Sequence, residues 1–111
     1  GIHIHCSDAA TPKDGPSAGA AITTVIYSLL NKLKIKKNIA ITGEININGD
    51  ITMIGGLDLK ITGGIRAGVT HFFFPKENEK DYIKYCKHNT HKNIKFTLVS
   101  HIREIFDKVF I

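Results

Sequence analysis

The side chain best suited to chemistry is the hydroxyl of Ser17, in the sequence TPKDGPSAG of residues 11–19. Its small neighbours, Ala18 and Gly19, leave room for a substrate carbonyl to approach. Pro16 suits the first turn of a helix, where a missing backbone N–H costs nothing. The free N–H groups and positive dipole end of such a helix would stabilise a developing oxyanion. Taken alone, the segment is explained more simply as an ordinary helix start.

A serine nucleophile needs a base, and a lysine suits that role better here than any histidine. His3 and His5 share one face of a predicted strand and the other histidines lie far along the chain, so no Ser-His-Asp set is evident. Lys60 follows a pair of glycines, and its apolar neighbours are Leu57, Leu59 and Ile61. Burial among them would disfavour the ammonium form and leave an amine able to accept a proton. Only the fold can bring Lys60 close to Ser17.

The elements that must position these side chains alternate along the chain. We expect strands at residues 2–6, 38–44, 45–54, 70–74 and 94–99, and helices at 16–33, 57–67, 79–88 and from 100 onward. Residues 38–54 are predicted to form a hairpin with an Asn-Gly turn at positions 48 and 49. This order predicts an α/β (α+β) fold in which helices flank a mixed, mostly parallel sheet.

Apolar spacing predicts which side of each helix faces the core. For the first helix these residues are Ala20, Ile22, Val25, Ile26, Leu29, Leu30 and Leu33. For the last helix, which Ser100 is expected to begin, they are Ile102, Ile105, Phe106, Val109 and Phe110. The three phenylalanines at 72–74 predict a buried strand that ends at Pro75. Asn78 is expected to cap the helix at 79–88, with Asp81 reinforcing its first turn.

Composition limits the class of protein. A chain of 111 residues with 42% apolar and 23% charged residues is typical of one globular domain, which excludes disorder as the main interpretation. No apolar run approaches the roughly 20 residues of a membrane span. The two cysteines, Cys6 and Cys86, exclude a disulfide framework. The net charge of +5 comes mainly from scattered lysines, which indicates a solvated surface rather than a nucleic-acid site.

The serine segment resembles the catalytic-serine motif of the Lon family of ATP-dependent proteases. Further motifs of that family follow in the same order: the strand IHIH at 2–5, AITGEI at 40–45, a Gly-Asp turn followed by IGGLDLK at 54–60, and PKEN at 75–78. The final lysine of IGGLDLK, Lys60, falls where the family has its catalytic lysine. The resemblance covers essentially all 111 residues.

The resemblance implies a Ser-Lys dyad peptidase. Ser17 would be the nucleophile, and Lys60 would act first as general base and then as general acid. Thr42 would hydrogen-bond Lys60 and hold its amine neutral and oriented. Asp14 would close over the site by pairing with that lysine. His5, on the strand that precedes the serine segment, would support the active-site region, although an ordinary strand histidine explains it equally well.

The resemblance also implies the architecture and setting of the whole protein. Residues 1–111 would form the C-terminal part of a Lon proteolytic domain, of the type also seen in domain 2 of ribosomal protein S5, and the chain would be a piece of a longer protein. ATP and magnesium would act in a separate ATPase domain, with no cofactor or metal bound by these residues. The whole protein would degrade unfolded or damaged polypeptides as a homo-hexamer, without needing nucleic acid or a membrane. It would lie in the cytoplasm of a bacterium or the mitochondrial matrix of a eukaryote, and would not be secreted.

Two features leave alternatives open. Gly63 and Gly64 replace alanines that are usual in the family, and they are expected to loosen the helix that carries Lys60. A helix start after Gly15 would also suit a phosphate, as in a nucleotide-binding domain related to small-metabolite kinases, or the chain could be an inactive subdomain. No Walker lysine follows the loop, so P-loop chemistry is excluded. The run Cys86-x-His88-x-x-His91 lacks a fourth ligand for zinc.

Overall fold

A computed structural model describes residues 19–111, and its core is a parallel sheet. Within that range the sheet has three strands, β1 (Ile39–Ile41), β4 (His71–Pro75) and β5 (Lys95–Val99), in the order β1-β4-β5. The predicted strand at residues 2–6 and the predicted helix start before position 19 lie outside the described residues. The α/β class with a mostly parallel sheet and flanking helices is confirmed.

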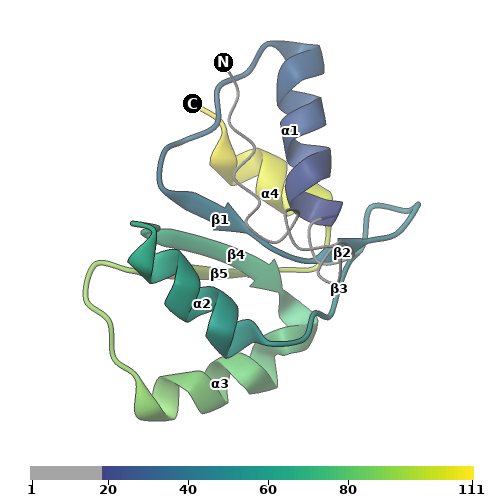
Figure 1. The fold of residues 1–111 in the computed structure, drawn as a ribbon. Helices are drawn as coiled ribbons and strands as arrows, with labels where there is room; N and C mark the ends of the chain where they lie inside the picture. The colour runs from purple at the N-terminus through teal and green to yellow at the C-terminus, as the bar shows by residue number, and fades with distance from the viewer. Residues whose placement is uncertain (1–18) are drawn as a thin grey trace.

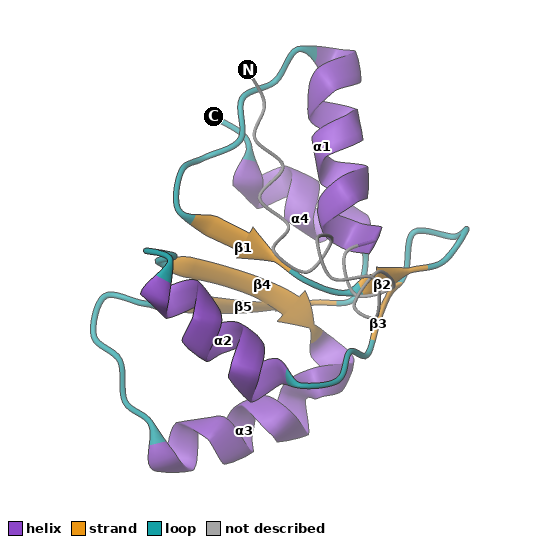
Figure 2. Ribbon diagram, in the orientation of Figure 1, coloured by secondary structure: helices purple, strands orange, loops and turns teal. Residues whose placement is uncertain are grey.

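Helices cover both faces of the sheet (Figure 1). On one face lie α1 (Gly19–Asn31) and α4 (Ile102–Val109), and on the other lie α2 (Leu57–Arg66) and α3 (Glu79–His88). A short 3₁₀ helix, η2 (Lys76–Asn78), joins β4 to α3. Figure 2 shows that α2 and α3 serve as the crossovers between neighbouring parallel strands, which such strands require. No helix in this part of the chain is both long and apolar enough to cross a membrane.

The central strand β4 is buried on both of its faces. Phe72, Phe73 and Phe74 are at most 3% exposed, which confirms the predicted buried strand. Successive side chains of a strand point to opposite faces, so Phe73 faces the α1 and α4 side while its two neighbours face α2 and α3. A continuous apolar run is the pattern expected of a strand that is covered on both faces.

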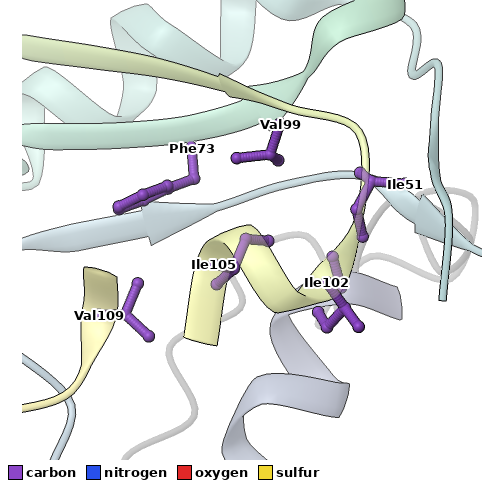
Figure 3. Packing of buried hydrophobic residues seen from close by; sticks show 7 residues of the cluster. Ile51, Phe73, Val99, Ile102, Ile105 and Val109 are labelled. Atoms are coloured by element: carbon purple, nitrogen blue, oxygen red, sulfur yellow. The ribbon is translucent and has the colours of Figure 1, made fainter. Parts of the chain in front are cut away.

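Two apolar clusters follow from this alternation. The cluster on the α4 side contains Ala20, Ile51, Phe73, Val99, Ile102, Ile105 and Val109. Figure 3 shows Phe73 and Val99 on the sheet face that Ile105 of α4 covers. The cluster on the α2 and α3 side contains Ile54, Leu57, Ile61, Phe72, Phe74 and Tyr85. Each large side chain that is fully buried contributes about 1.5–3 kcal/mol to folding.

The predicted hairpin at 38–54 is correct only in its second half. β1 ends at Ile41 and pairs in parallel with β4, so it does not continue into the hairpin. The antiparallel pair is formed by β2 (Glu44–Ile45) and β3 (Ile51–Thr52). The predicted Asn-Gly turn lies between them, with the Asn46 side chain accepting hydrogen bonds from two backbone N–H groups.

The predicted core-facing side of α1 is correct for Ala20 and Val25 and wrong for the larger aliphatic residues. The helix buries small residues, namely Ala20, Ala21, Thr24, Val25 and Ser28. The larger aliphatic residues on its other side are exposed, namely Ile22, Ile26, Leu29 and Leu30. Leu33 is also exposed and lies beyond the helix, which ends at Asn31 rather than at the predicted residue 33. Small side chains let α1 lie close to the sheet and to α4, where Tyr27 stacks on Phe106 at a ring-centroid distance of 4.1 Å.

The start of α4 also differs from the prediction, although its buried side is confirmed. The cap residue is His101, whose Nδ1 accepts a hydrogen bond from the backbone N–H of Arg103. Ser100 lies one residue earlier, and its hydroxyl donates to the Glu104 carboxylate at 3.0 Å. Ile102, Ile105 and Val109 are buried as expected.

The two glycines of α2 have different surroundings. The helix runs without a break from Leu57 to Arg66, so they do not interrupt it. A Cβ atom at Gly64 would lie 2.4 Å from Cε1 of Phe72, whereas one at Gly63 would meet nothing within 4 Å. Gly64 is therefore required by close packing of α2 on the sheet, and Gly63 is not.

We predict opposite effects for alanine at these positions. Gly63→Ala should raise the free energy of unfolding by up to about 1 kcal/mol, because alanine favours the helix. Gly64→Ala should lower it by about 1–2 kcal/mol, because the overpacking against Phe72 outweighs that gain. Urea unfolding of the two variants, compared with the unsubstituted protein, measures both changes. Equal stabilisation by both substitutions would contradict the close packing at Gly64.

His71 at the start of β4 makes stability depend on pH. Burial lowers the pKa of His71 below its ordinary value of 6.5, and the charges of Lys95, Lys36 and Lys108 lower this pKa further. Its Nε2 lies 2.7 Å from the Thr97 hydroxyl. The unfolded chain therefore binds the His71 proton more tightly than the folded protein does.

We predict that the contribution of neutral His71 to stability is complete above about pH 6.5 and is lost as the pH falls through and below that value. His71→Gln should reduce the fall in urea midpoint between about pH 7.5 and about pH 5. The matched control is His88→Gln, on an exposed residue in the last turn of α3. Equal reductions in both variants would show that His71 is not the source of the pH dependence of stability.

Candidate active site

The carboxyl end of β1 is tied to the start of α1. Thr42 follows the strand, is 7% exposed, and donates its backbone N–H to the Phe73 carbonyl at 3.0 Å. The next carbonyl, that of Gly43, accepts a hydrogen bond from the backbone N–H of Ala20 at 3.0 Å. This bond joins the first turn of α1 to the residue directly after Thr42.

Glycine at positions 19 and 43 allows this close approach. A Cβ atom at Gly19 would lie 3.1 Å from Cγ2 of Ile45, and one at Gly43 would lie 2.6 Å from Cγ2 of Ile51. Gly43 also has a φ of +149°, which side-chain-bearing residues rarely adopt. Both glycines belong to motifs recognised in the sequence, SAG at 17–19 and TGE at 42–44. The absence of a side chain lets Gly19 lie against β2 and lets Gly43 lie against Ile51.

Lys60 lies in the first turn of α2, on the other face of the sheet. Its backbone N–H donates to the Gly56 carbonyl at 3.1 Å, and its side chain is half-buried. Of the apolar neighbours expected around it, Leu57 and Ile61 are 3% and 0% exposed, but Leu59 is 74% exposed. The expectation that Leu59 helps to bury the lysine is therefore wrong, because Leu59 points outward from α2.

The start of α2 has an unusual backbone. Its cap residue, Gly56, has a left-handed conformation with φ of 67° and ψ of 36°, and makes no side-chain capping bond. Gly55 and Gly56 have open space where a Cβ would lie. The segment that leads to Lys60 is therefore positioned by contacts on either side of the glycine pair rather than by a cap.

These parts meet at one edge of the sheet. In Figure 1 the amino ends of α1 and α2 lie toward the side at which β1 ends. Thr42 directly follows β1, and Lys60 lies in the first turn of α2. The carboxyl edge of a parallel sheet is the usual location of ligand sites in α/β proteins. Ser17, Asp14 and His5, with His3, lie outside the described residues.

One site-related residue, Asn78, has a different role from the predicted one. It occupies the cap position of α3, but its side chain makes no capping hydrogen bond. Its amide instead bonds the backbone of Ile54, in the segment before α2, and donates to the Asp81 carboxylate at 2.8 Å. Asn78 is fully buried, which distinguishes it from an ordinary helix cap. Apart from the capping pattern, its place in the motif PKEN was the feature of the sequence that pointed to a role for this residue.

The possible metal ligands on α3 and after it are not gathered into a site. Within residues 19–111, no three His, Cys, Asp or Glu side chains are grouped so that they could hold a metal ion. Cys86 is exposed, and Nε2 of His91 lies 2.6 Å from the Tyr85 hydroxyl. Burial raises the pKa of Tyr85, and Cys86 raises it further, so the phenol stays protonated at neutral pH. His91 is thus engaged by a neutral tyrosine.

A pocket of about 400 Å³ lies beside the start of α2. Its lining combines the Gly55–Gly56 backbone with charged side chains of α2 and α3, including Asp58, Asp81 and Lys84. The pocket is next to the glycine pair that leads to Lys60. Carboxylates, an ammonium group and backbone polar groups line it.

Comparisons with known proteins agree with the motif order. The family model described as the Lon protease (S16) C-terminal proteolytic domain matches residues 1–111. The chain is 42% identical over 110 residues to the Lon protease of Finegoldia magna, covering 99% of this chain and 14% of that protein. It is 42% identical over 109 residues to the mitochondrial Lon protease homolog of Homo sapiens, covering 98% of this chain and 11% of that protein. The chain therefore spans a small part of the length of these relatives.

Proposed function

The chain belongs to the Lon protease family, and on that premise we propose that it hydrolyses peptide bonds with Ser17 as nucleophile and Lys60 as general base. The observation that carries the proposal is the hydrogen bond from Ala20 N–H to the Gly43 carbonyl. Ser17 precedes Ala20 by three residues in the sequence, and Thr42 directly precedes Gly43.

The proposed reaction proceeds through an acyl-enzyme. The neutral amine of Lys60 accepts the proton of the Ser17 hydroxyl as its oxygen attacks the scissile carbonyl. The resulting ammonium group gives that proton to the leaving amine, and the acyl group stays on the serine. Lys60 then takes a proton from water, whose oxygen attacks the ester, and returns the proton to Ser17 as the peptide acid leaves.

The surroundings of Lys60 support this role. Leu57 and Ile61 are buried near the start of α2 and anchor it to the core, and the Lys60 side chain between them in sequence is half-buried. We assign to Thr42 a hydrogen bond to Lys60 that orients the amine toward Ser17. Peptide N–H groups at the start of α1 would stabilise the oxyanion.

The setting of the whole protein is also a proposal. We propose that the substrates are unfolded or damaged polypeptides, and that the protein acts in an ATP-dependent homo-hexamer whose nucleotide is bound outside residues 1–111. The relatives include bacterial and mitochondrial Lon proteases. We therefore place the protein in a bacterial cytoplasm or a mitochondrial matrix.

We predict that Ser17→Ala and Lys60→Ala each abolish peptide hydrolysis while the protein stays folded. Lys60→Arg should do the same, because a guanidinium group cannot give up its proton at these pH values. A peptidyl boronate should label the unsubstituted protein, and labelling should be lost in Ser17→Ala. Hydrolysis is measured with a fluorogenic peptide, and folding by circular dichroism.

Two results would contradict the dyad. Full activity in Lys60→Arg would remove Lys60 as the base. Tight ATP binding by residues 1–111, with no boronate labelling, would favour the phosphate-binding alternative instead.

We predict that hydrolysis rises between about pH 7 and about pH 9, as one group loses its proton. If Asp14 pairs with the Lys60 ammonium, the pair holds the base protonated, so Asp14→Asn should shift this rise to lower pH. Rates are measured across the pH range with saturating peptide. An unchanged pH profile in Asp14→Asn would exclude Asp14 from the mechanism.

A further inference from the structure

The side-chain amide of Asn78 pairs with the backbone of Ile54, in the segment between β3 and α2. Its Oδ1 accepts a hydrogen bond from the Ile54 N–H at 3.0 Å, and its Nδ2 donates to the Ile54 carbonyl at 2.9 Å. The amide therefore pairs with both backbone polar groups of one residue, as a neighbouring peptide would in a β-ladder. The second N–H of the same amide donates to Asp81.

This pairing is buried and is supported by a neighbouring contact. Asn78 is 0% exposed and Ile54 is 5% exposed. One residue earlier, the Met53 N–H donates to the Glu77 carboxylate at 2.7 Å. Two consecutive side chains of η2 thus hold two consecutive backbone N–H groups after β3. Because a buried polar group without a partner is destabilising, the Ile54 backbone depends on Asn78.

The pairing fixes one end of the segment that leads to Lys60. From Ile54 the chain passes through Gly55 and Gly56, which have no side chain to hold them, and then enters α2. The other end is fixed by the buried side chains of Leu57 and Ile61. With no side-chain cap on α2, the position of its first turn is set from both ends, by the Ile54 backbone and by the buried Leu57 and Ile61 side chains.

We infer that Asn78 is a positioning residue for catalysis, which sets the location of Lys60 through the Ile54 backbone. The inference rests on the proposed dyad, because the position of Lys60 matters for catalysis only if its amine must reach Ser17. Asn78 is fully buried and acts through the Ile54 backbone rather than on the substrate. Its amide keeps the glycine pair and the first turn of α2 from shifting relative to the end of β1.

The test compares variants of the native protein in peptide hydrolysis. Asn78→Ala removes both bonds to Ile54, and Asn78→Asp keeps the acceptor but loses the donor. In both we expect kcat per folded molecule to fall on the order of 10- to 100-fold, with KM within about twofold, since small misplacements of a reacting group have effects of this size. The folded fraction is measured by circular dichroism.

Two matched variants serve as controls. Asn31→Ala removes an asparagine-to-backbone hydrogen bond near the end of α1, away from Ile54 and the pocket, so kcat should stay within about twofold. Ile105→Val weakens the α4-side cluster without touching Ile54, so it shows the effect of lower stability alone.

The kcat values of these variants support or overturn the positioning role of Asn78. An unchanged kcat in Asn78→Ala, or a loss matched by Ile105→Val, overturns the inference. Failure of both Asn78 variants to fold, where Ile105→Val does fold, makes Asn78 a stability residue and also overturns it. Activity retained in Lys60→Ala would contradict the proposed dyad. If Lys60→Ala is inactive and Asn78→Ala is fully active, only the present inference fails.

Discussion

The burial of β4 on both faces is the constraint on which the rest of the structure depends. Phe73 fills one apolar cluster, and Phe72 and Phe74 fill the other, so both helical layers are anchored to three consecutive residues. The strands on either side pair in parallel with β4, and each connection must therefore cross a face of the sheet with a helix. Close packing on Phe72 in turn requires a glycine at position 64.

This layered arrangement leaves few ways to build a site. Side chains within the sheet are occupied with packing, so the candidate residues lie where strands end and helices begin. Two polar contacts fix that edge: the Ala20–Gly43 hydrogen bond on the α1 side and the Asn78–Ile54 pairing on the α2 side. Each joins segments that are more than 20 residues apart in the sequence, and each lies within a few residues of a proposed catalytic group.

The sequence predicted the elements better than it predicted their surroundings. The continuous apolar run at β4, the Asn-Gly turn and the three helices from α2 to α4 each have a local signal, and all are confirmed. The buried side of α1 was predicted only in part, because helical spacing favours large aliphatic residues whereas the packing selected small ones. The bonds of Asn78 were missed because its partner, Ile54, is distant in sequence, and a capping pattern gave a sufficient local explanation. Lys60 was singled out by the glycine pair before it and its apolar neighbours, whereas Thr42 was named only through a family motif.

The cluster between the sheet and α4 also sets an order of events during synthesis. Its members include Ala20 near the start of the chain and Val109 near position 111, so it is incomplete until nearly all of these residues have left the ribosome. At roughly 5–20 residues per second, α1 waits on the order of 10 s for the helix that covers its small-residue side. The α2 and α3 side needs nothing beyond β5 and forms earlier. The residues that complete the side carrying Lys60 are therefore synthesised before the residues that complete the side carrying α1.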